Sequence, residues 1–134
     1  MDTDTLVENF LDDGQKLVAE LPQRGFEVMA AFWIQPSWDG KWYFYVVSPL
    51  VDAEGITQAY RRLHPLVRAR PQPVWIDPLK IRLIGPSDPL ARDVLAALGR
   101  LTVNGDRPIR WSGTWLGNLS IDGAYLYPVP AATP

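Results

Sequence analysis

Two neighbouring stretches of the chain, Phe26–Gln35 and Lys41–Ser48, constrain the fold more than any other part of the sequence. Both are rich in β-branched and aromatic residues, and Asp39–Gly40 lies between them, which predicts two strands joined as a hairpin. Apolar residues occupy odd and even positions alike, so neither strand has a polar face. Strands of this kind are normally covered on both faces. We therefore expect the hairpin to lie inside a sheet, with an irregular connection over Pro36–Gly40.

The aromatic residues of this hairpin define a possible binding surface. Alternation along each strand predicts two aromatic sets on opposite faces, namely Trp33 with Tyr43 and Tyr45, and Phe32 with Trp42 and Phe44. If the helices pack on one face only, one set is left for a partner, and a patch of that size usually marks an interaction site. The alternative is that helices cover both faces.

The remaining patterns surround the hairpin with helices and further strands. They predict, in chain order, a helix from the Thr5–Glu8 capping box to Pro22, a helix between Asp52 and His64 with Pro65 breaking its pattern, a strand within Val74–Ile84, a helix from Pro89 to Asn104–Gly105, and a hairpin of Pro108–Thr114 and Leu119–Tyr127. The order α-β-β-α-β-α-β-β predicts a single α+β domain, a five-stranded mixed sheet packed with three helices. It spans residues 1–128, and residues 129–134 form a Pro-rich tail.

Composition excludes several classes of function. The chain of 134 residues has no Cys and one His, which excludes disulfides, thiolate catalysis and metal sites built from Cys or several His. No cofactor is expected. The net charge of −2 gives no general attraction to nucleic acid or to an anionic membrane. The sequence has neither a signal-peptide pattern nor an apolar run of the ~18 residues that a membrane span needs. We expect a cytoplasmic protein without membrane contact.

Asp52 and Glu54 are the candidates for catalysis. They follow the end of a predicted strand, where open α/β sheets often bind ligands, and with nearby Arg they would suit a phosphorylated or nucleic-acid substrate. Acidic residues in the first turn of a helix are also ordinary capping residues. The sequence contains no phosphate-binding glycine motif, and His64 lies directly before Pro65 at a predicted helix end, where it is interpreted as a surface residue.

A basic cluster is formed by Arg61, Arg62, Arg68 and Arg70. Ten of the thirteen basic residues are Arg, the type suited to phosphate and base recognition, which leaves a nucleic-acid-binding segment open. The acidic pI of about 5.3 and the lack of a known RNA-binding motif favour a solvated helix face instead.

Several short segments of the sequence resemble small uncharacterised bacterial proteins of unknown function. The resemblance covers roughly Leu6 to Pro128 and is carried by Gly25–Val28 with Trp33, Ser48–Asp52 with Gly55 and Ala59–Arg62, and Ile121–Pro128. It implies no activity, cofactor or site residue.

The sequence therefore favours a non-enzymatic binding or accessory protein that acts through protein–protein contacts, with a partner protein or as a homo-oligomer. Trp, Tyr and Arg are the residue types enriched at binding hot spots. The residues expected to bind are Trp33, Trp42, Tyr43, Tyr45, Arg61, Arg62, Arg68 and Arg70. Trp38 and Trp115 fall near the two hairpin loops, where a recognition role is also open.

Overall fold

The computed structural model describes residues 8–70, 76–77, 80–101, 109–116 and 119–127. Its elements are α1 (Glu8–Gln23), β1 (Ala30–Pro36), β2 (Tyr43–Val47), α2 (Pro49–Glu54), α3 (Ile56–Arg68), β3 (Ile81–Ile84), α4 (Pro89–Leu101), β4 (Ile109–Leu116) and β5 (Leu119–Leu126). The strands form one five-stranded sheet in the order β3-β2-β1-β5-β4. β2 and β3 run parallel and the other neighbours antiparallel, so the sheet is mixed. The predicted single α+β domain is confirmed.

The first hairpin lies inside the sheet, as predicted, because β1 pairs with β2 on one side and β5 on the other. The predicted division of its aromatic residues is wrong. Trp33 lies opposite Phe44, and Phe32 lies opposite Tyr45, so Trp33 does not share a face with Tyr43 and Tyr45. The register of a hairpin depends on its connection, and a slip of one residue moves every side chain of one strand to the other face.

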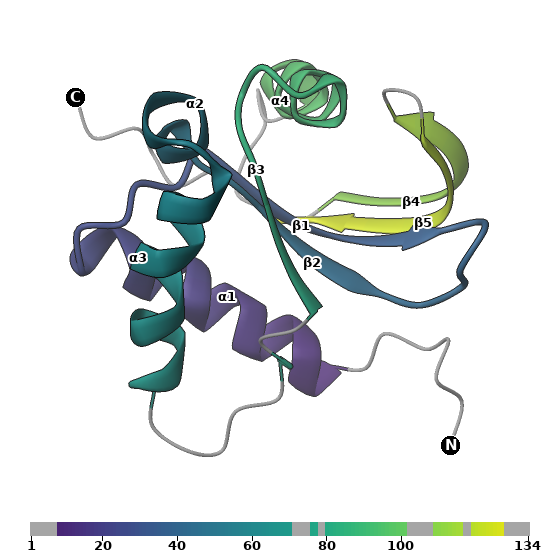
Figure 1. Cartoon of the computed structure of the whole chain (residues 1–134). Coiled ribbons are helices and arrows are strands. Elements are labelled where there is room, and N and C mark those ends of the chain that lie inside the picture. The colour runs from purple at the N-terminus through teal and green to yellow at the C-terminus, as the bar shows by residue number, and fades with distance from the viewer. Residues whose placement is uncertain (1–7, 71–75, 78–79, 102–108, 117–118, 128–134) are drawn as a thin grey trace.

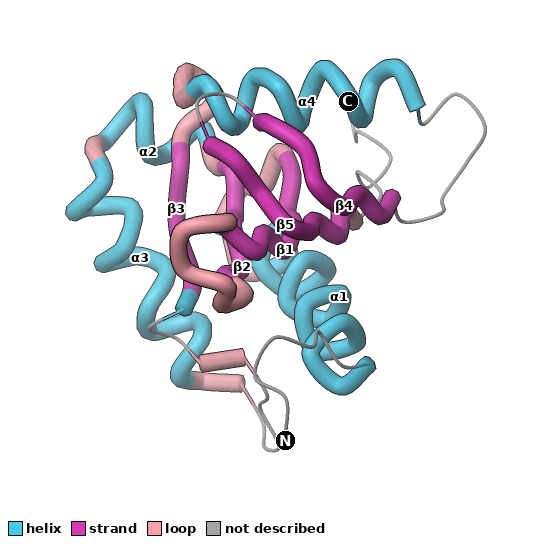
Figure 2. The backbone as a smooth tube through the Cα atoms, turned by 90° about the vertical axis from the view of Figure 1, so that its right-hand side faces the viewer, coloured by secondary structure: helices cyan, strands magenta, loops and turns pink. Residues whose placement is uncertain are grey.

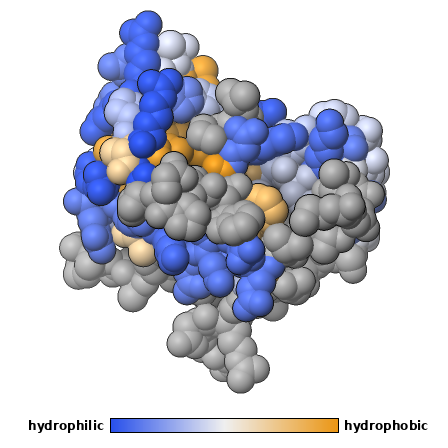
Figure 3. Space-filling model, turned by 90° about the horizontal axis from the view of Figure 1, so that it is seen from below, coloured by the Kyte–Doolittle hydropathy of each residue, from blue (hydrophilic) through white to orange (hydrophobic). Residues whose placement is uncertain are grey.

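Helices cover both faces of the sheet. Leu17 and Leu21 of α1 and Leu63 of α3 pack with Trp33 and Phe44 in one core cluster. On the other face α4 packs against β1 and β5, and Figures 1 and 2 show the sheet between α1 and α4. The view from below in Figure 3 is mainly hydrophilic where residues are described, with hydrophobic residues in small areas only. The alternative in which helices wrap both faces is therefore the one that the structure adopts.

Two helices rather than one connect β2 to β3. Gly55 separates α2 from α3 with a φ of 91°, a conformation that glycine adopts without strain. α2 begins directly after Ser48, whose hydroxyl accepts a hydrogen bond from the Leu50 N–H at 3.2 Å. α3 continues past Pro65 to Arg68, because a proline near the end of a helix removes one hydrogen bond while its own carbonyl still accepts from Ala69.

The helix α4 begins as predicted, with Pro89 at its first position and the Asp88 carboxylate accepting from the Leu90 N–H at 2.9 Å. Other predicted features lie outside the described residues, namely Thr5, Val74, Asn104–Gly105 and the tail 129–134.

The second hairpin curls toward the α4 side of the sheet (Figure 1). The pairing of β1 with β5 shifts by one residue between Gln35 and Pro36, a bulge that bends a strand. Leu116 and Leu119, at the far end of the hairpin, consequently pack with Leu90 of α4. This curl makes the α4 face concave.

Candidate functional site

The two candidate catalytic residues, Asp52 and Glu54, make separate structural contacts. Asp52 accepts hydrogen bonds from the Ser87 N–H at 3.2 Å and the Ser87 hydroxyl at 2.9 Å, which fixes the connection between β3 and α4. Glu54 pairs with Arg62 at 3.0 Å on the surface of the helices. Since Asp52 binds Ser87 and Glu54 binds Arg62, the structure does not support a shared catalytic role for the two acidic residues.

His64 packs beside an aromatic neighbour on α3. The His64 ring lies 5.5 Å from the ring of Tyr60, its neighbour one helical turn away. Among the described residues, no group of three or more His, Asp or Glu side chains is arranged to hold a metal ion.

The predicted basic cluster divides between the surface and the interior. Arg61, Arg62 and Arg68 are exposed on α3. Arg70 is 6% exposed and points inward, where it pairs with Asp13 of α1 at 2.6 Å and with Glu20 at 3.3 Å. Three of the four cations therefore remain at the surface, and the fourth joins α1 to the end of α3.

Asp13 also holds the chain beyond α3. Its second carboxylate oxygen accepts from the Ile76 N–H at 2.9 Å, within a buried setting. A buried charge of this kind is tolerated because it is both paired and hydrogen-bonded.

The predicted aromatic binding residues are largely part of the core. Trp33 is 3% exposed, and its indole N–H donates to the Tyr127 hydroxyl at 2.9 Å. Trp42 is half-buried and its ring covers Gly123, leaving no room there for a Cβ. Tyr43 is buried and donates to the Asp39 carboxylate, a hydrogen bond that raises the pKa of Tyr43. Of the four aromatic candidates, only Tyr45 lines the groove described below.

Two other tryptophans are strongly exposed, Trp38 at 75% and Trp115 at 68%. The sheet brings them near one another. The Ser37 N–H donates to the Ser120 carbonyl at 3.0 Å, and Ser120 lies opposite Trp115 in the β4–β5 ladder. The two tryptophans are thus one strand apart at the same end of the sheet.

A small polar cluster lies between these tryptophans. The Ser37 hydroxyl donates to Asp122 at 2.8 Å and lies 3.0 Å from the Ser120 hydroxyl. We call the set of Trp38, Trp115, Ser37, Ser120 and Asp122 the tryptophan surface.

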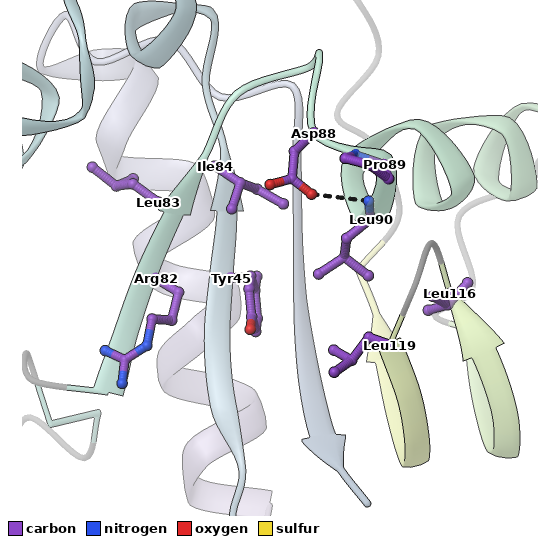
Figure 4. Close-up of a pocket in the computed structure, with 9 residues that line it drawn as sticks. All are labelled: Tyr45, Arg82, Leu83, Ile84, Asp88, Pro89, Leu90, Leu116 and Leu119. Atoms are coloured by element: carbon purple, nitrogen blue, oxygen red, sulfur yellow. Dashed lines mark hydrogen bonds between the residues drawn. The ribbon is translucent and has the colours of Figure 1, made fainter. Parts of the chain in front are cut away.

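A groove lies on the opposite, concave side of the sheet (Figure 4). It measures about 440 Å³ and is lined by Tyr45, Arg82, Leu83, Ile84, Asp88, Pro89, Leu90, Leu116 and Leu119. We call it the Tyr45 groove. Its walls come from β2, β3, the start of α4 and the far end of the second hairpin.

The lining of the Tyr45 groove is mainly apolar, with Arg82 on the β3 wall and Asp88 at the start of α4. Leu90, Leu116 and Leu119 stand across from Tyr45 and Arg82 in Figure 4. Burial raises the pKa of Tyr45 above the usual tyrosine value. Sequence reasoning did not find Arg82, although a single cation within the apolar strand Ile81–Ile84 is an unusual pattern.

Comparisons with known proteins add no identification: no family model matches the chain, and neither a curated protein nor a solved structure is significantly similar to it. In the part of the chain that the structure describes, no helix combines the length and apolar character needed to cross a membrane.

Proposed function

We propose that the protein is a non-enzymatic binding or accessory protein that works through protein–protein contacts, and that the tryptophan surface is its contact region. The single observation that carries the proposal is the exposure of two tryptophans at one end of the sheet, 75% for Trp38 and 68% for Trp115. Tryptophan is the residue type most enriched at the energetic centres of protein interfaces.

The energetic gain from covering such residues is large. A tryptophan side chain buries about 150–250 Å² on complete burial, and apolar burial stabilises by about 25 cal/mol per Å². Each of the two indoles can therefore contribute about 2 kcal/mol or more to a complex, which is the size of an interface hot spot. Between them, Ser37, Ser120 and Asp122 supply polar atoms for interface hydrogen bonds.

The charges on this surface favour a protein over a nucleic acid. Asp122 accepts a hydrogen bond from Ser37, the residue directly before Trp38, and a carboxylate repels the phosphate groups that dominate nucleic-acid binding. The basic cluster supports nucleic-acid binding less than the sequence suggested, because Arg70 is enclosed by Asp13 and Glu20.

Photo-crosslinking tests the proposal directly. A photoreactive phenylalanine analogue is placed at position 38 or 115 of the full chain, and covalent products formed in cells are identified by mass spectrometry. Ile56 provides a matched control position, since among the described residues it is the third large hydrophobic residue that is exposed, at 45%, and it lies at the start of α3.

We expect one protein, either a different chain or a second copy, to be crosslinked from positions 38 and 115 but not from position 56. Crosslinking from position 38 should disappear when Trp115 is replaced by Ser. Light scattering of the purified protein separates self-association from binding of a different chain. The same products from all three positions, or none from positions 38 and 115, would overturn the proposal.

A further inference from the structure

The two edges of the sheet differ in how they are covered. β3 forms one edge beside α3, and β4 is the outermost strand at the other edge (Figure 2). The outer side of β3 is closed by Tyr60 of α3, whose hydroxyl accepts from the Leu83 N–H at 2.9 Å and donates to the Ile81 carbonyl at 3.4 Å. β3 is also only four residues long and contains Arg82. A covering element, a short length and a charge are usual protections of a strand edge.

The edge formed by β4 is longer and more open. β4 has eight residues from Ile109 to Leu116, twice as many as β3, and its sequence contains neither Pro nor Lys. Gly113 and Trp115 are both exposed. Within the described ranges, no other element forms backbone hydrogen bonds with β4 apart from β5. In that part of the chain, β4 is therefore open to a further strand.

Trp115 directs its backbone toward this open edge. In an antiparallel ladder, residues that are hydrogen-bonded to their partners alternate with residues that are not, and the latter point their N–H and C=O to the other side of the strand. The Ser120 carbonyl accepts from the Ser37 N–H at 3.0 Å, so the backbone of Ser120 faces away from β4. Trp115 is the ladder partner of Ser120. Its own N–H and C=O therefore face outward.

Ser112 has the same orientation. The Tyr127 N–H donates to the Ala31 carbonyl of β1 at 3.2 Å, so every second residue before Tyr127 also bonds to β1 along the regular part of this ladder. Gly123 belongs to this series and is the partner of Ser112 in the β4–β5 ladder. Since the backbone of Gly123 faces β1, that of Ser112 faces the open edge. β4 thus presents backbone donors and acceptors on either side of Gly113.

The interruption at Gly113 favours an extended segment of another chain over a second copy as the occupant. The β4–β5 pairing covers Ile109–Ser112 and Thr114–Leu116, and Gly113 lies between them with a φ of 60°. A second copy would pair β4 with itself about a two-fold axis, and full overlap would place both interruptions at the centre of the new ladder. A flexible segment can instead follow the bend of a single β4 strand.

We propose that the partner of the tryptophan surface adds an extended strand to β4, an inference that rests on the proposed function and specifies the kind of partner. The added strand exchanges backbone hydrogen bonds with Ser112 and Trp115. Directly opposite side chains on neighbouring strands pack together, so an apolar side chain of the partner lies beside the Trp115 indole. The partner is therefore a protein with an extended segment in which every second residue is apolar.

Two synthetic peptides test strand addition directly. One is Lys-Thr-Val-Thr-Val-Thr-Val-Lys, and the other has the same sequence with an N-methyl group on every Thr and Val. Each is titrated into the isotopically labelled full chain, and binding is followed by the NMR shifts of assigned backbone amides. We expect saturable shifts at Ser112 and Trp115 with the first peptide. The second should bind at least about tenfold more weakly, because its methylated backbone cannot donate to β4.

Two substitutions at Ser112 isolate the backbone contact on the protein side. Ser112→Pro removes the outward N–H, which an edge strand tolerates because this group takes no part in the β4–β5 ladder. Ser112→Ala keeps the N–H and is the matched control. We expect Ser112→Pro to weaken binding of the first peptide about tenfold and Ser112→Ala to leave it within about twofold. Thermal melts establish folding, and if Ser112→Pro does not fold, the two peptides still decide the outcome with the unmodified protein.

Equal binding of the two peptides, no binding of the first, or equal effects of the two Ser112 variants would overturn strand addition. Shifts confined to β3 would place the added strand at the opposite edge, which is also contrary to the proposal. Crosslinks from positions 38 and 115 that persist in Ser112→Pro would leave the proposed function intact without strand addition. Peptide binding to β4 without any crosslinked protein would count against the proposed function alone. Self-association that Ser112→Pro abolishes would identify a second copy as the occupant and contradict the choice made here.

Discussion

The substitution Tyr127→Phe tests how the first helix is attached to the sheet. The Tyr127 hydroxyl donates to the Leu11 carbonyl of α1 at 2.7 Å and accepts from the Trp33 indole N–H of β1 at 2.9 Å. Trp33 and Tyr127 are 3% and 4% exposed, so water cannot replace the missing oxygen. One atom thus joins α1, β1 and the residue that follows β5.

The expected loss of stability follows from those two hydrogen bonds. Without the hydroxyl, the Trp33 N–H is buried and unpaired, which costs about 1–3 kcal/mol. The bond to Leu11 contributes about 0.5–1.5 kcal/mol more. We therefore expect the free energy of unfolding to fall by about 2–4 kcal/mol and the Tm to fall by roughly 10 °C.

Urea unfolding followed by tryptophan fluorescence measures this difference. Tyr45→Phe is the matched control, because it removes the same atom from a half-buried tyrosine whose hydroxyl has no hydrogen bond in the described residues. We expect the control to stay within about 0.5 kcal/mol of the unmodified protein. If Tyr127→Phe also stays within that range, or if both variants lose equal stability, the reasoning about the shared hydroxyl is refuted.

Three further predictions concern the same part of the core and are checked by the same unfolding assay. Burial raises the pKa of Tyr127 far above its usual value. Because the folded state favours the protonated hydroxyl, the stabilisation from Tyr127 is complete at pH values below the pKa of about 10 that tyrosine has in the unfolded chain. This stabilisation is lost as the pH rises above that value. The unmodified protein should therefore lose more stability than Tyr127→Phe between pH 9 and pH 11, and parallel pH curves would contradict this. Gly14→Ala should destabilise by about 1–3 kcal/mol in spite of the better helix propensity of Ala, because the new Cβ would collide with the Tyr127 side chain; an increase in stability would show that α1 can shift. Asp13→Asn should cost about 3 kcal/mol or more, because the buried Arg70 would lose its shorter ion pair and keep only the 3.3 Å contact with the less buried Glu20, whereas Arg62→Gln on the exposed pair should cost less than about 1 kcal/mol. Equal losses from those two variants would mean that burial does not decide the strength of the ion pairs.

The sequence predicts the elements and their order well, because their signals are local. Periodicity identifies the strands, and the Asp88–Pro89 pair identifies the start of α4. The two-sided apolar pattern of β1 and β2 correctly predicts that this hairpin lies inside the sheet. The division at Gly55 into α2 and α3 was missed, because a single glycine does not by itself end a helix.

The candidate sites could not be predicted to the same degree, because they depend on contacts between distant residues. The face that Tyr45 occupies follows from the hairpin register, which alternation alone does not determine. In the sequence, nothing distinguishes Arg70 from the nearby Arg61 and Arg68. Its ion pair with Asp13 becomes visible only when α1 is placed against the end of α3. The Tyr45 groove likewise requires the curl of β4 and β5, which brings Leu119 toward residues far away in the chain.

The position of β1 also has a consequence for synthesis on the ribosome. β1 is the first strand to be made, yet one of its two neighbours, β5, is the last of the five. Until β5 leaves the ribosome, the nascent chain exposes an unpaired edge of β1, a strand that is almost wholly buried in the folded protein, and α1 cannot form its bond to Tyr127. We infer that a chain arrested before Leu119 presents an unpaired strand edge, the kind of surface that chaperones shield, so that the sheet closes only after β5 has been translated.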